Sequence, residues 1–142
     1  TTLFRSQRCI DEAVAYSKER KQFGQPIADF QNTQFMLADM QTELEAARTL
    51  LYAAAVKVTD NAPDKTRFAA MAKRFATDTG SSVVDRALQL HGGYGYLMDY
   101  PIERFWRDLH AGGSHVCNVR EPILTAWGLD QFGGEVPLGT LY

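Results

Sequence analysis

Seven apolar residues between positions 37 and 58 are spaced alternately three and four positions apart, and this spacing constrains the fold more than any other feature. They are Leu37, Met40, Leu44, Ala47, Leu51, Ala54 and Val58. Such spacing places side chains along one stripe of an α-helix. The sequence therefore predicts one long helix, starting at about Phe30, whose apolar stripe packs against neighbouring helices.

The segment TDNAPDK, residues 59–65, predicts the end of this helix and the beginning of another. Asp60 or Asn61 can cap a new helix, and Pro63 suits a first turn, where a missing N–H group removes no hydrogen bond. The next arm repeats small and apolar residues that let a neighbouring helix approach closely, namely Ala69, Ala72, Ala76, Val83, Ala87 and Leu90. We expect an antiparallel helical hairpin that ends at Gly92-Gly93.

Shorter helices are predicted on both sides of the hairpin. An opening helix around Ile10, Ala13 and Val14 should stop near Gly24-Gln25-Pro26, because glycine and proline together end helices. After the hairpin, we expect a short helix from Pro101 through Leu109, a break at Gly112-Gly113, and a last helix from about Val119 or Pro122 to Trp127. Period-2 apolar alternation of useful length does not occur, so no sheet is expected.

These elements predict an all-α fold, an up-and-down four-helix-type bundle. The chain of 142 residues is long enough for one domain with its own core. The helical domain is expected over residues 1–130, followed by a tail over residues 131–142 that is rich in glycine and proline.

Composition argues against several classes of protein. The 15 basic and 17 acidic side chains form no block of one sign, so nucleic acid is not an expected partner. No apolar run is long enough for a membrane span, and the three histidines lack the spacing of a metal site. Cys9 and Cys117 are far apart in the sequence, which favours two reduced thiols over a disulfide. Because the first residues contain neither a methionine nor a signal peptide, we expect a fragment of a cytoplasmic protein.

Two stretches can carry chemistry, and for each the local residues leave two interpretations open. In KERKQFGQP, residues 18–26, the Arg20 guanidinium suits a phosphate with Phe23 stacking nearby, or the cations simply cap a solvated helix end. In QLHGGYGY, residues 89–96, the glycines allow a ligand to approach the backbone closely, or they form an ordinary helix end. Tyr94, Tyr96 and Tyr100 fit the core or an interface.

Taken together, three segments resemble the acyl-CoA dehydrogenase family. They are AYSKERKQFGQPIADFQNTQFMLADM, AKRFATD and RALQLHGGYGYLMDYPIERFWRD, and the resemblance extends to about Trp127. It implies the carboxy-terminal helical domain of an FAD enzyme whose amino-terminal helical domain and middle β domain are absent from this chain. It also implies an acyl-CoA substrate, self-association as a homotetramer or dimer, and an electron acceptor such as electron-transfer flavoprotein.

The same resemblance implies a set of cofactor-binding residues. Arg20 and Phe23 match positions that contact FAD, commonly across a subunit interface, and Gln31 matches another position of that region. Gln89, Gly92 and Gly93 match a stretch that reaches the adenine and pyrophosphate side of a neighbour's flavin. Asn118 stands where a threonine often contacts the flavin.

The catalytic base of the family has no counterpart at its usual place. A gap-free continuation from Arg107-Asp108 puts His115, Val116 and Cys117 where many members carry a glutamate, and Val116 cannot take a proton. We therefore assign no catalytic residue in this chain. Our leading hypothesis is a glutamate that precedes Thr1, as in the isovaleryl-CoA and long-chain branch of the family.

The missing glutamate is also compatible with a relocated base or with a different function. His115 or Glu121 can serve as a relocated base. The protein can also be a base-less paralogue or a relative of the flavin monooxygenases and oxidases. A non-catalytic helical oligomerisation module is the alternative from a different class. The segments QFMLADM and AKRFATD are similar to members that act on short branched acyl chains.

Overall fold

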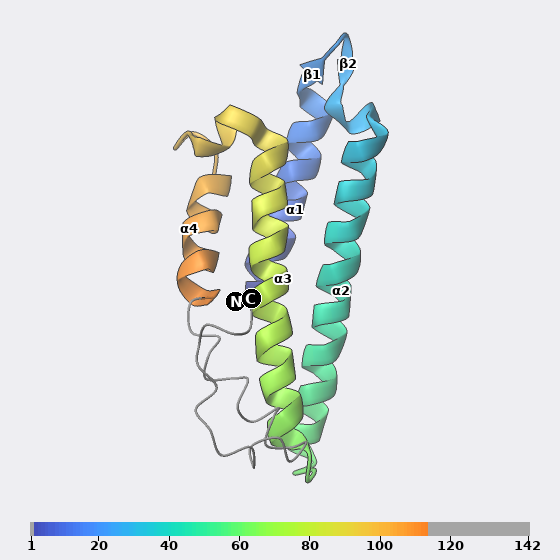
Figure 1. Ribbon diagram of the computed structural model, residues 1–142, viewed down its shortest axis with the longest axis vertical. Coiled ribbons are helices and arrows are strands. Elements are labelled where there is room, and N and C mark those ends of the chain that lie inside the picture. The colour runs from blue at the N-terminus through green and yellow to red at the C-terminus, as the bar shows by residue number, and fades with distance from the viewer. Residues whose placement is uncertain (1, 114–142) are drawn as a thin grey trace, which may run out of the picture.

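The computed structural model describes residues 2–113, which form four long or medium helices packed side by side (Figure 1). Helix α1 covers Thr2–Glu19, α2 covers Gln31–Thr59, α3 covers Lys65–His91 and α4 covers Ile102–Gly113. Helix α3 packs against each of the other three. The predicted all-α bundle is confirmed. The predicted last helix, Asn118, the tail and the domain boundary at residue 130 lie outside the described residues.

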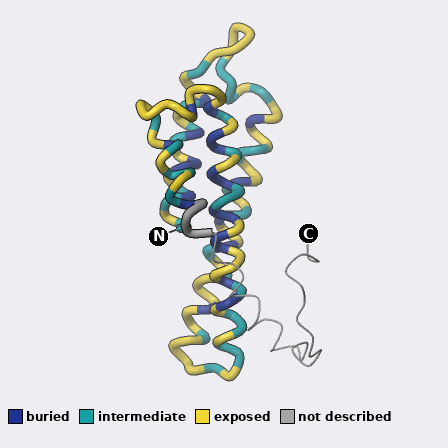
Figure 2. The backbone as a smooth tube through the Cα atoms, turned by 60° about the vertical axis from the view of Figure 1, so that its left-hand side comes forward, coloured by how far each residue is buried: buried dark blue, intermediate teal, exposed yellow. Residues whose placement is uncertain are grey.

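The core lies where all four helices run together, and every helix contributes to it (Figure 2). Its buried residues are Cys9, Ile10, Ala13, Met40, Leu44, Val83, Val84, Ala87, Leu88, Ile102 and Leu109. Burying a large apolar side chain stabilises a fold by roughly 1.5–3 kcal/mol. Burial of these side chains therefore provides most of the force that holds the helices together.

The large side chains of the apolar stripe of α2 are buried in the first half of the helix and partly exposed in its second half. Met40, Leu44, Ala47 and Ala54 are buried, whereas Leu51 is 42% and Val58 is 53% exposed. The reason is length, because the far ends of α2 and α3 extend beyond α1 and α4 (Figure 1). Among residues 2–113, the partner arm of the hairpin is the helix that covers the stripe there.

The small-residue arm of the hairpin becomes α3, and its closest contact is at Gly80. Among the predicted positions Ala72, Ala76, Val83 and Ala87 are buried, and Ala69 is exposed. An added Cβ at Gly80 would lie 2.7 Å from Thr2 Cγ2 and 3.2 Å from Ser6 Oγ. Helix α1 thus crosses α3 at a point where only glycine leaves enough room.

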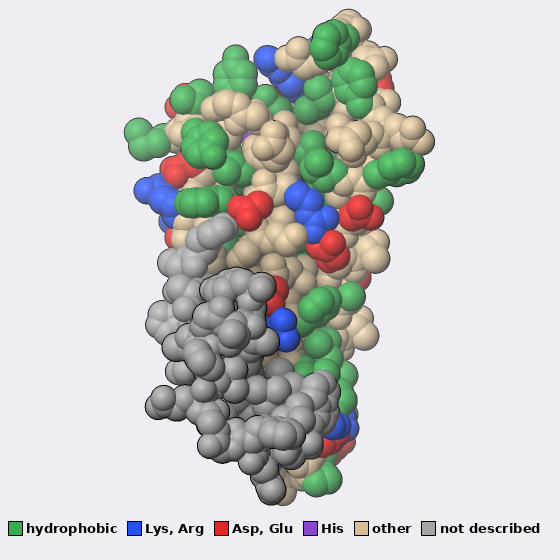
Figure 3. Space-filling view, in the orientation of Figure 1, with side chains coloured by type: hydrophobic (Ala, Val, Ile, Leu, Met, Phe, Trp, Pro, Cys, Tyr) green, Lys and Arg blue, Asp and Glu red, His purple; other side chains and the backbone are tan. Residues whose placement is uncertain are grey.

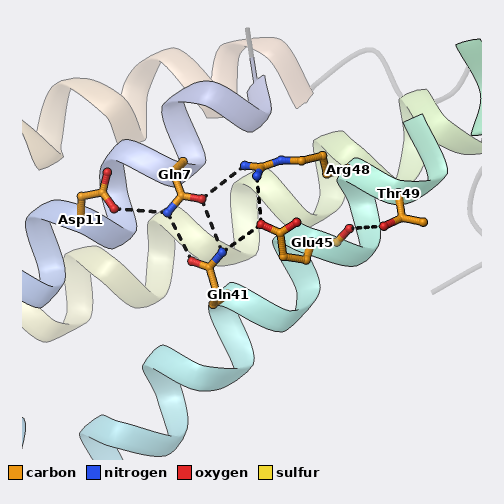
Figure 4. A network of polar contacts seen from close by, with 6 residues as sticks. All are labelled: Gln7, Asp11, Gln41, Glu45, Arg48 and Thr49. Atoms are coloured by element: carbon orange, nitrogen blue, oxygen red, sulfur yellow. Dashed lines mark hydrogen bonds and ion pairs between the residues drawn. The ribbon is translucent and has the colours of Figure 1, made fainter. Parts of the chain in front are cut away.

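Polar contacts also join the helices. A network at the surface between α1 and α2 centres on Gln7, whose Nε2 donates to Gln41 Oε1 at 3.3 Å (Figure 4). Arg48 Nη2 donates to Gln7 Oε1 at 3.3 Å, while Arg48 Nη1 binds Glu45 Oε1 at 2.9 Å. On the other side of the bundle, Trp106 Nε1 of α4 donates to Asp85 Oδ1 of α3 at 2.6 Å. These contacts fix how the helices are rotated against one another.

The expected absence of a sheet is wrong at one short hairpin between α1 and α2. Strands β1 (Lys21–Gln22) and β2 (Gln25–Pro26) pair in antiparallel orientation. Phe23 and Gly24 form the turn with φ of 53° and 83°, the positive values that tight two-residue hairpins require. Because each strand has two residues, no alternation reveals them in the sequence. Helix α1 consequently ends at Glu19, before the predicted Gly24-Gln25-Pro26 stop.

The predicted cap of α3 is also wrong. Asp60 closes the end of α2, Pro63 lies in the turn, and Asp64 occupies the position before the first residue of α3. The Asp64 side chain makes no capping hydrogen bond to the helix. Instead Lys57 Nζ binds its two carboxylate oxygens at 2.8 and 2.9 Å, and Arg67 Nη2 lies 3.4 Å from Oδ2. The turn is held by ion pairs and not by the capping pattern that we expected.

This arrangement predicts a pH-dependent contribution to stability. The hydrogen bond from Lys57, reinforced by the Lys57 and Arg67 charges, lowers the pKa of Asp64 below 3.8. A carboxyl whose pKa is lower in the folded state stabilises the fold above its ordinary pKa, and this is lost as pH falls. Asp64→Asn should lower the unfolding free energy at pH 7, and the deficit should shrink below the ordinary pKa and disappear once pH has fallen below the lowered pKa of the folded state. Urea unfolding across pH, with Asp60→Asn as control, measures this; a deficit independent of pH would contradict it.

Cys9 is buried in the core and is expected to be chemically inert. Its side chain has no exposed surface, and burial, with a smaller effect of the nearby Glu12 charge, raises its thiol pKa to about 12. The reactive species is the thiolate. Iodoacetamide at pH 8 should therefore leave Cys9 unmodified in the native chain and modify it fully in urea, as peptide mass mapping would reveal. Rapid native modification of Cys9 would contradict its placement in the core.

Candidate functional site

Six of the predicted cofactor-binding residues lie at one end of the bundle, the upper end in Figure 1. Arg20 follows α1, Phe23 forms the tip of the β1–β2 hairpin, and Gln31 begins α2. Gln89 is in the last turn of α3, and Gly92 and Gly93 begin the 3-10 helix η2, Gly92–Tyr96. The up-and-down order brings these distant segments to the same end.

Arg20 is fixed at the base of the hairpin by its backbone. Its N–H donates to the Tyr16 carbonyl at 2.8 Å, and its own carbonyl accepts from the Ile27 N–H at 2.8 Å. Its guanidinium carbon lies 5.1 Å from the centre of the Tyr94 ring. This cation–π contact connects the end of α1 to η2, beside the glycine turn.

The guanidinium of Arg20 has one further neighbour. With the amide of Gln22 oriented so that its oxygen faces Arg20, that oxygen accepts from Nε at 3.2 Å and from Nη2 at 2.7 Å. A guanidinium has five N–H donors, so donors remain for an anion. Arg20 is therefore held in place and is still able to bind a phosphate.

Phe23 presents an exposed aromatic ring at the tip of the hairpin. Its side chain is 95% exposed, and its ring lies perpendicular to the Phe30 ring, with 6.4 Å between ring centres. Its φ of 53° lies in the left-handed region, which costs a residue with a Cβ about 1–2 kcal/mol. The hairpin thus holds an aromatic side chain in solvent, where a ring system of a ligand or another protein surface can cover it.

The turn after α3 has an open outer face. Gly92 has φ of 58° and ψ of −137°, and its N–H donates to the Gln89 carbonyl. A Cβ added at Gly92 or Gly93 would meet no atom of the described residues within 4 Å. At Gly95, by contrast, a Cβ would lie 2.9 Å from Leu88 Cδ1 and 3.0 Å from the Leu88 carbonyl oxygen. Gly95 is therefore needed for internal packing, whereas the first two glycines leave space for a ligand.

The residues at this end of the bundle have the donors and the open space needed to contact one side of a phosphate-bearing dinucleotide. An open glycine turn, a fixed guanidinium and the exposed amide of Gln89 lie at the same end of the bundle. Gln31 is exposed at the start of α2 and belongs to the same end. The structure thus brings Arg20 and the glycine turn together and leaves Gln31 and Phe23 at the margin.

Sequence reasoning missed two residues that support the site, Tyr16 and His91. Their rings stack with centres 4.3 Å apart, and Tyr100 lies edge-on to both. Burial raises the pKa of Tyr16, and the Arg20 charge opposes this change. Tyr16 precedes Arg20 by one helical turn, and His91 directly precedes the glycines, so sequence proximity to the motifs was the available signal.

Exposed apolar side chains surround the site. Tyr94 is 42% and Tyr96 is 77% exposed, so these tyrosines are not core residues, whereas Tyr100 is partly buried against the core. Leu97 and Met98 extend the exposed apolar surface. Figure 3 shows hydrophobic side chains gathered over this end of the molecule.

Residues 2–113 contain no candidate for a metal site or a membrane span. Nowhere in this range do three or more His, Cys, Asp or Glu side chains group as metal ligands would. No helix in the same range combines the length and apolar character needed to cross a bilayer.

Comparison with known proteins gives a family assignment. Residues 1–112 match the model of the acyl-CoA dehydrogenase C-terminal domain. The chain is 50% identical over 103 residues to the caffeyl-CoA reductase–Etf complex subunit CarC of Acetobacterium woodii, covering 72% of this chain and 27% of the relative. It is 52% identical over 104 residues to the 3-(aryl)acrylate reductase of Clostridium sporogenes, covering 73% of this chain and 27% of the relative.

A solved structure agrees with the sequence relatives. Butyryl-CoA dehydrogenase from Megasphaera elsdenii superposes with a TM-score of 0.80 and 38% identity, covering 89% of this chain and 33% of that chain. The chain thus spans 27% of the length of the two sequence relatives. On the match over residues 1–112 and the shared helical bundle, the chain belongs to the acyl-CoA dehydrogenase family and carries its C-terminal domain.

Proposed function

We propose that this chain acts within an FAD-dependent oxidoreductase of acyl-CoA thioesters, where it forms one wall of the FAD site. The observation that carries the proposal is the fixed Arg20 guanidinium beside an open Gly92-Gly93 turn. The family to which the chain belongs is flavin-dependent, and the donor set suits phosphate. FAD bound at this site would supply the acceptor for the hydride that leaves the β carbon of the acyl chain.

Each predicted residue has a task in this proposal. Arg20 binds a phosphate oxygen through its remaining N–H donors, and Gly92 and Gly93 allow the cofactor to approach their backbone. The Gln89 amide hydrogen-bonds to polar atoms of the cofactor, and the Phe23 ring covers an aromatic ring of the cofactor. Gln31 contributes its side-chain amide to the cofactor site from the start of α2. Asn118, which lies outside the described residues, stays a prediction.

The proposed reaction needs a base, and we assign none in this chain. Proton abstraction from the α carbon requires a carboxylate in a pocket that excludes water. The position of Val116 lies outside the described residues, and valine has no titratable group. We therefore propose that the base is supplied by a residue that is not part of this chain.

Self-association is part of the proposal. The far ends of α2 and α3 expose apolar side chains that a second copy can cover, namely Leu51, Tyr52, Val56, Val58 and Phe75. Exposed apolar groups of this kind are typical of interfaces. A homotetramer or dimer is proposed, with electron-transfer flavoprotein as electron partner, because one relative is named as a subunit of an Etf complex. The cytoplasmic location stays a prediction from the sequence.

Reduction of an α,β-unsaturated acyl compound is the second candidate function. It is favoured by the names of two relatives that are about half identical to this chain, a caffeyl-CoA reductase complex subunit and a 3-(aryl)acrylate reductase. The two candidates use the same cofactor and differ in the direction of hydride transfer.

The test uses the purified full-length gene product. A bound flavin should give a visible absorption band, and a saturated acyl-CoA added without oxygen should bleach it. Straight and short branched thioesters serve as the panel. If saturated thioesters have no effect but cinnamoyl-CoA reoxidises the dithionite-reduced protein, the reductase is supported. A colourless protein that does not take up FAD would contradict both and favour a non-catalytic module.

A further inference from the structure

The side chain of Tyr16 is bonded to the main chain at the end of α3. Its hydroxyl donates to the His91 carbonyl oxygen at 3.3 Å, across 75 residues of sequence. The next N–H, that of Gly92, donates to the Gln89 carbonyl. The His91–Gly92 peptide group is therefore held at both its oxygen and its nitrogen. A planar peptide fixed at both ends has a fixed orientation.

His91 supports this arrangement from within the helix. A carbonyl oxygen can only accept, so the 2.8 Å contact between His91 Nδ1 and the Ala87 carbonyl assigns the proton to Nδ1. The buried imidazole stacks on the Tyr16 ring with an interplanar angle of 21°. The ring contact and the hydroxyl contact thus hold the same residue by its side chain and by its backbone.

Tyr16 is also connected to Arg20. The Tyr16 carbonyl accepts the Arg20 N–H at 2.8 Å, and Tyr100 lies edge-on to both Tyr16 and Tyr94. Arg20 in turn lies over the Tyr94 ring. One residue therefore connects the two elements of the candidate site, the guanidinium at the end of α1 and the glycine turn after α3.

We propose that Tyr16 is a positioning residue that holds the Gly92-Gly93 turn in the orientation that receives the phosphate-bearing part of the cofactor. The inference rests on the proposed function, because it takes that turn as a cofactor contact. Tyr16 itself does not need to touch the cofactor. Its hydroxyl fixes the peptide group before the turn. The turn is therefore already ordered when the cofactor binds.

The test compares Tyr16→Phe with Tyr100→Phe in the full-length protein. Phenylalanine keeps the ring stack on His91 and removes only the hydroxyl. Tyr100 contacts the same rings and serves as the matched control for the loss of a hydroxyl. We expect FAD to bind about fivefold more weakly to the Tyr16→Phe apoprotein, the equivalent of one ordinary hydrogen bond. Tyr100→Phe should change the Kd by less than about twofold, well under that equivalent. Equal Kd values for wild type and Tyr16→Phe would overturn the inference.

A double-mutant cycle with Gly93→Ala separates positioning from a general loss of stability. If Tyr16 acts through the turn, its substitution should have little further effect on the FAD Kd once Gly93→Ala already obstructs that turn. Fully additive effects would overturn the inference. The proposed function fails in a different way, through a wild-type protein that does not bind FAD or an Arg20→Ala variant that retains it fully. Hydrogen exchange at Gly92 and Gly93 in the apoprotein, faster in Tyr16→Phe, is a readout independent of the cofactor.

Discussion

Arg20→Ala in the full-length protein is expected to weaken FAD binding at least about tenfold. A charged donor on a phosphate contributes roughly 1.5–3 kcal/mol, and the base of the hairpin holds this guanidinium against Tyr94 of the glycine turn. Arg20→Lys should recover little, because an ammonium lacks the planar pair of donors. The Kd of the apoprotein for FAD and the flavin-to-protein ratio after gel filtration both measure the effect.

Arg74→Ala is the matched control for this experiment. Arg74 is a half-exposed arginine on α3 that pairs with Asp78 at 3.4 Å, well away from the site end of the bundle. The Arg74→Ala substitution removes the same charged side chain as Arg20→Ala. FAD binding that falls equally in both variants would point to net charge, and unchanged binding in Arg20→Ala would remove Arg20 from the cofactor site.

Leu44→Ala is expected to destabilise the 142-residue chain by about 2–5 kcal/mol, the usual range for a large buried aliphatic side chain. Leu44 has no exposed surface and lies among the four helices. Leu51 lies two helical turns further along the same apolar stripe and is 42% exposed. Leu51→Ala should therefore lower the unfolding free energy by less than about 1 kcal/mol. Urea unfolding of both variants measures the difference. Equal losses would contradict the conclusion that Leu44 lies in the core and that Leu51 lies largely outside it.

The helices were predictable because their signals are local. The regular spacing from Leu37 to Val58 predicts α2, and Gly92-Gly93 predicts the end of α3, where Gly92 indeed adopts a positive φ. The β1–β2 hairpin and the position of Asp64 were missed. Each depends on a few side chains and on backbone angles, such as the positive φ of Phe23, that the residue types alone do not demand.

The candidate site was predictable in its parts and not in its assembly. The motifs around Arg20 and Gly92 are visible in the sequence, and the resemblance to the family joins them. The contacts that bring them together are long-range, from Tyr16 to His91 and from Arg20 to Tyr94. Such contacts depend on the packing of α1 against α3, which no local pattern specifies.

Hydrogen exchange of the full-length protein with and without FAD tests the central claim most directly, since it reports which backbone segments the cofactor protects. FAD should slow exchange in residues 18–26 and 89–96, while the far ends of α2 and α3 around residues 55–70 should not change. If FAD leaves the exchange rates of residues 18–26 and of residues 89–96 unchanged, the assignment of the FAD site to this end of the bundle is contradicted.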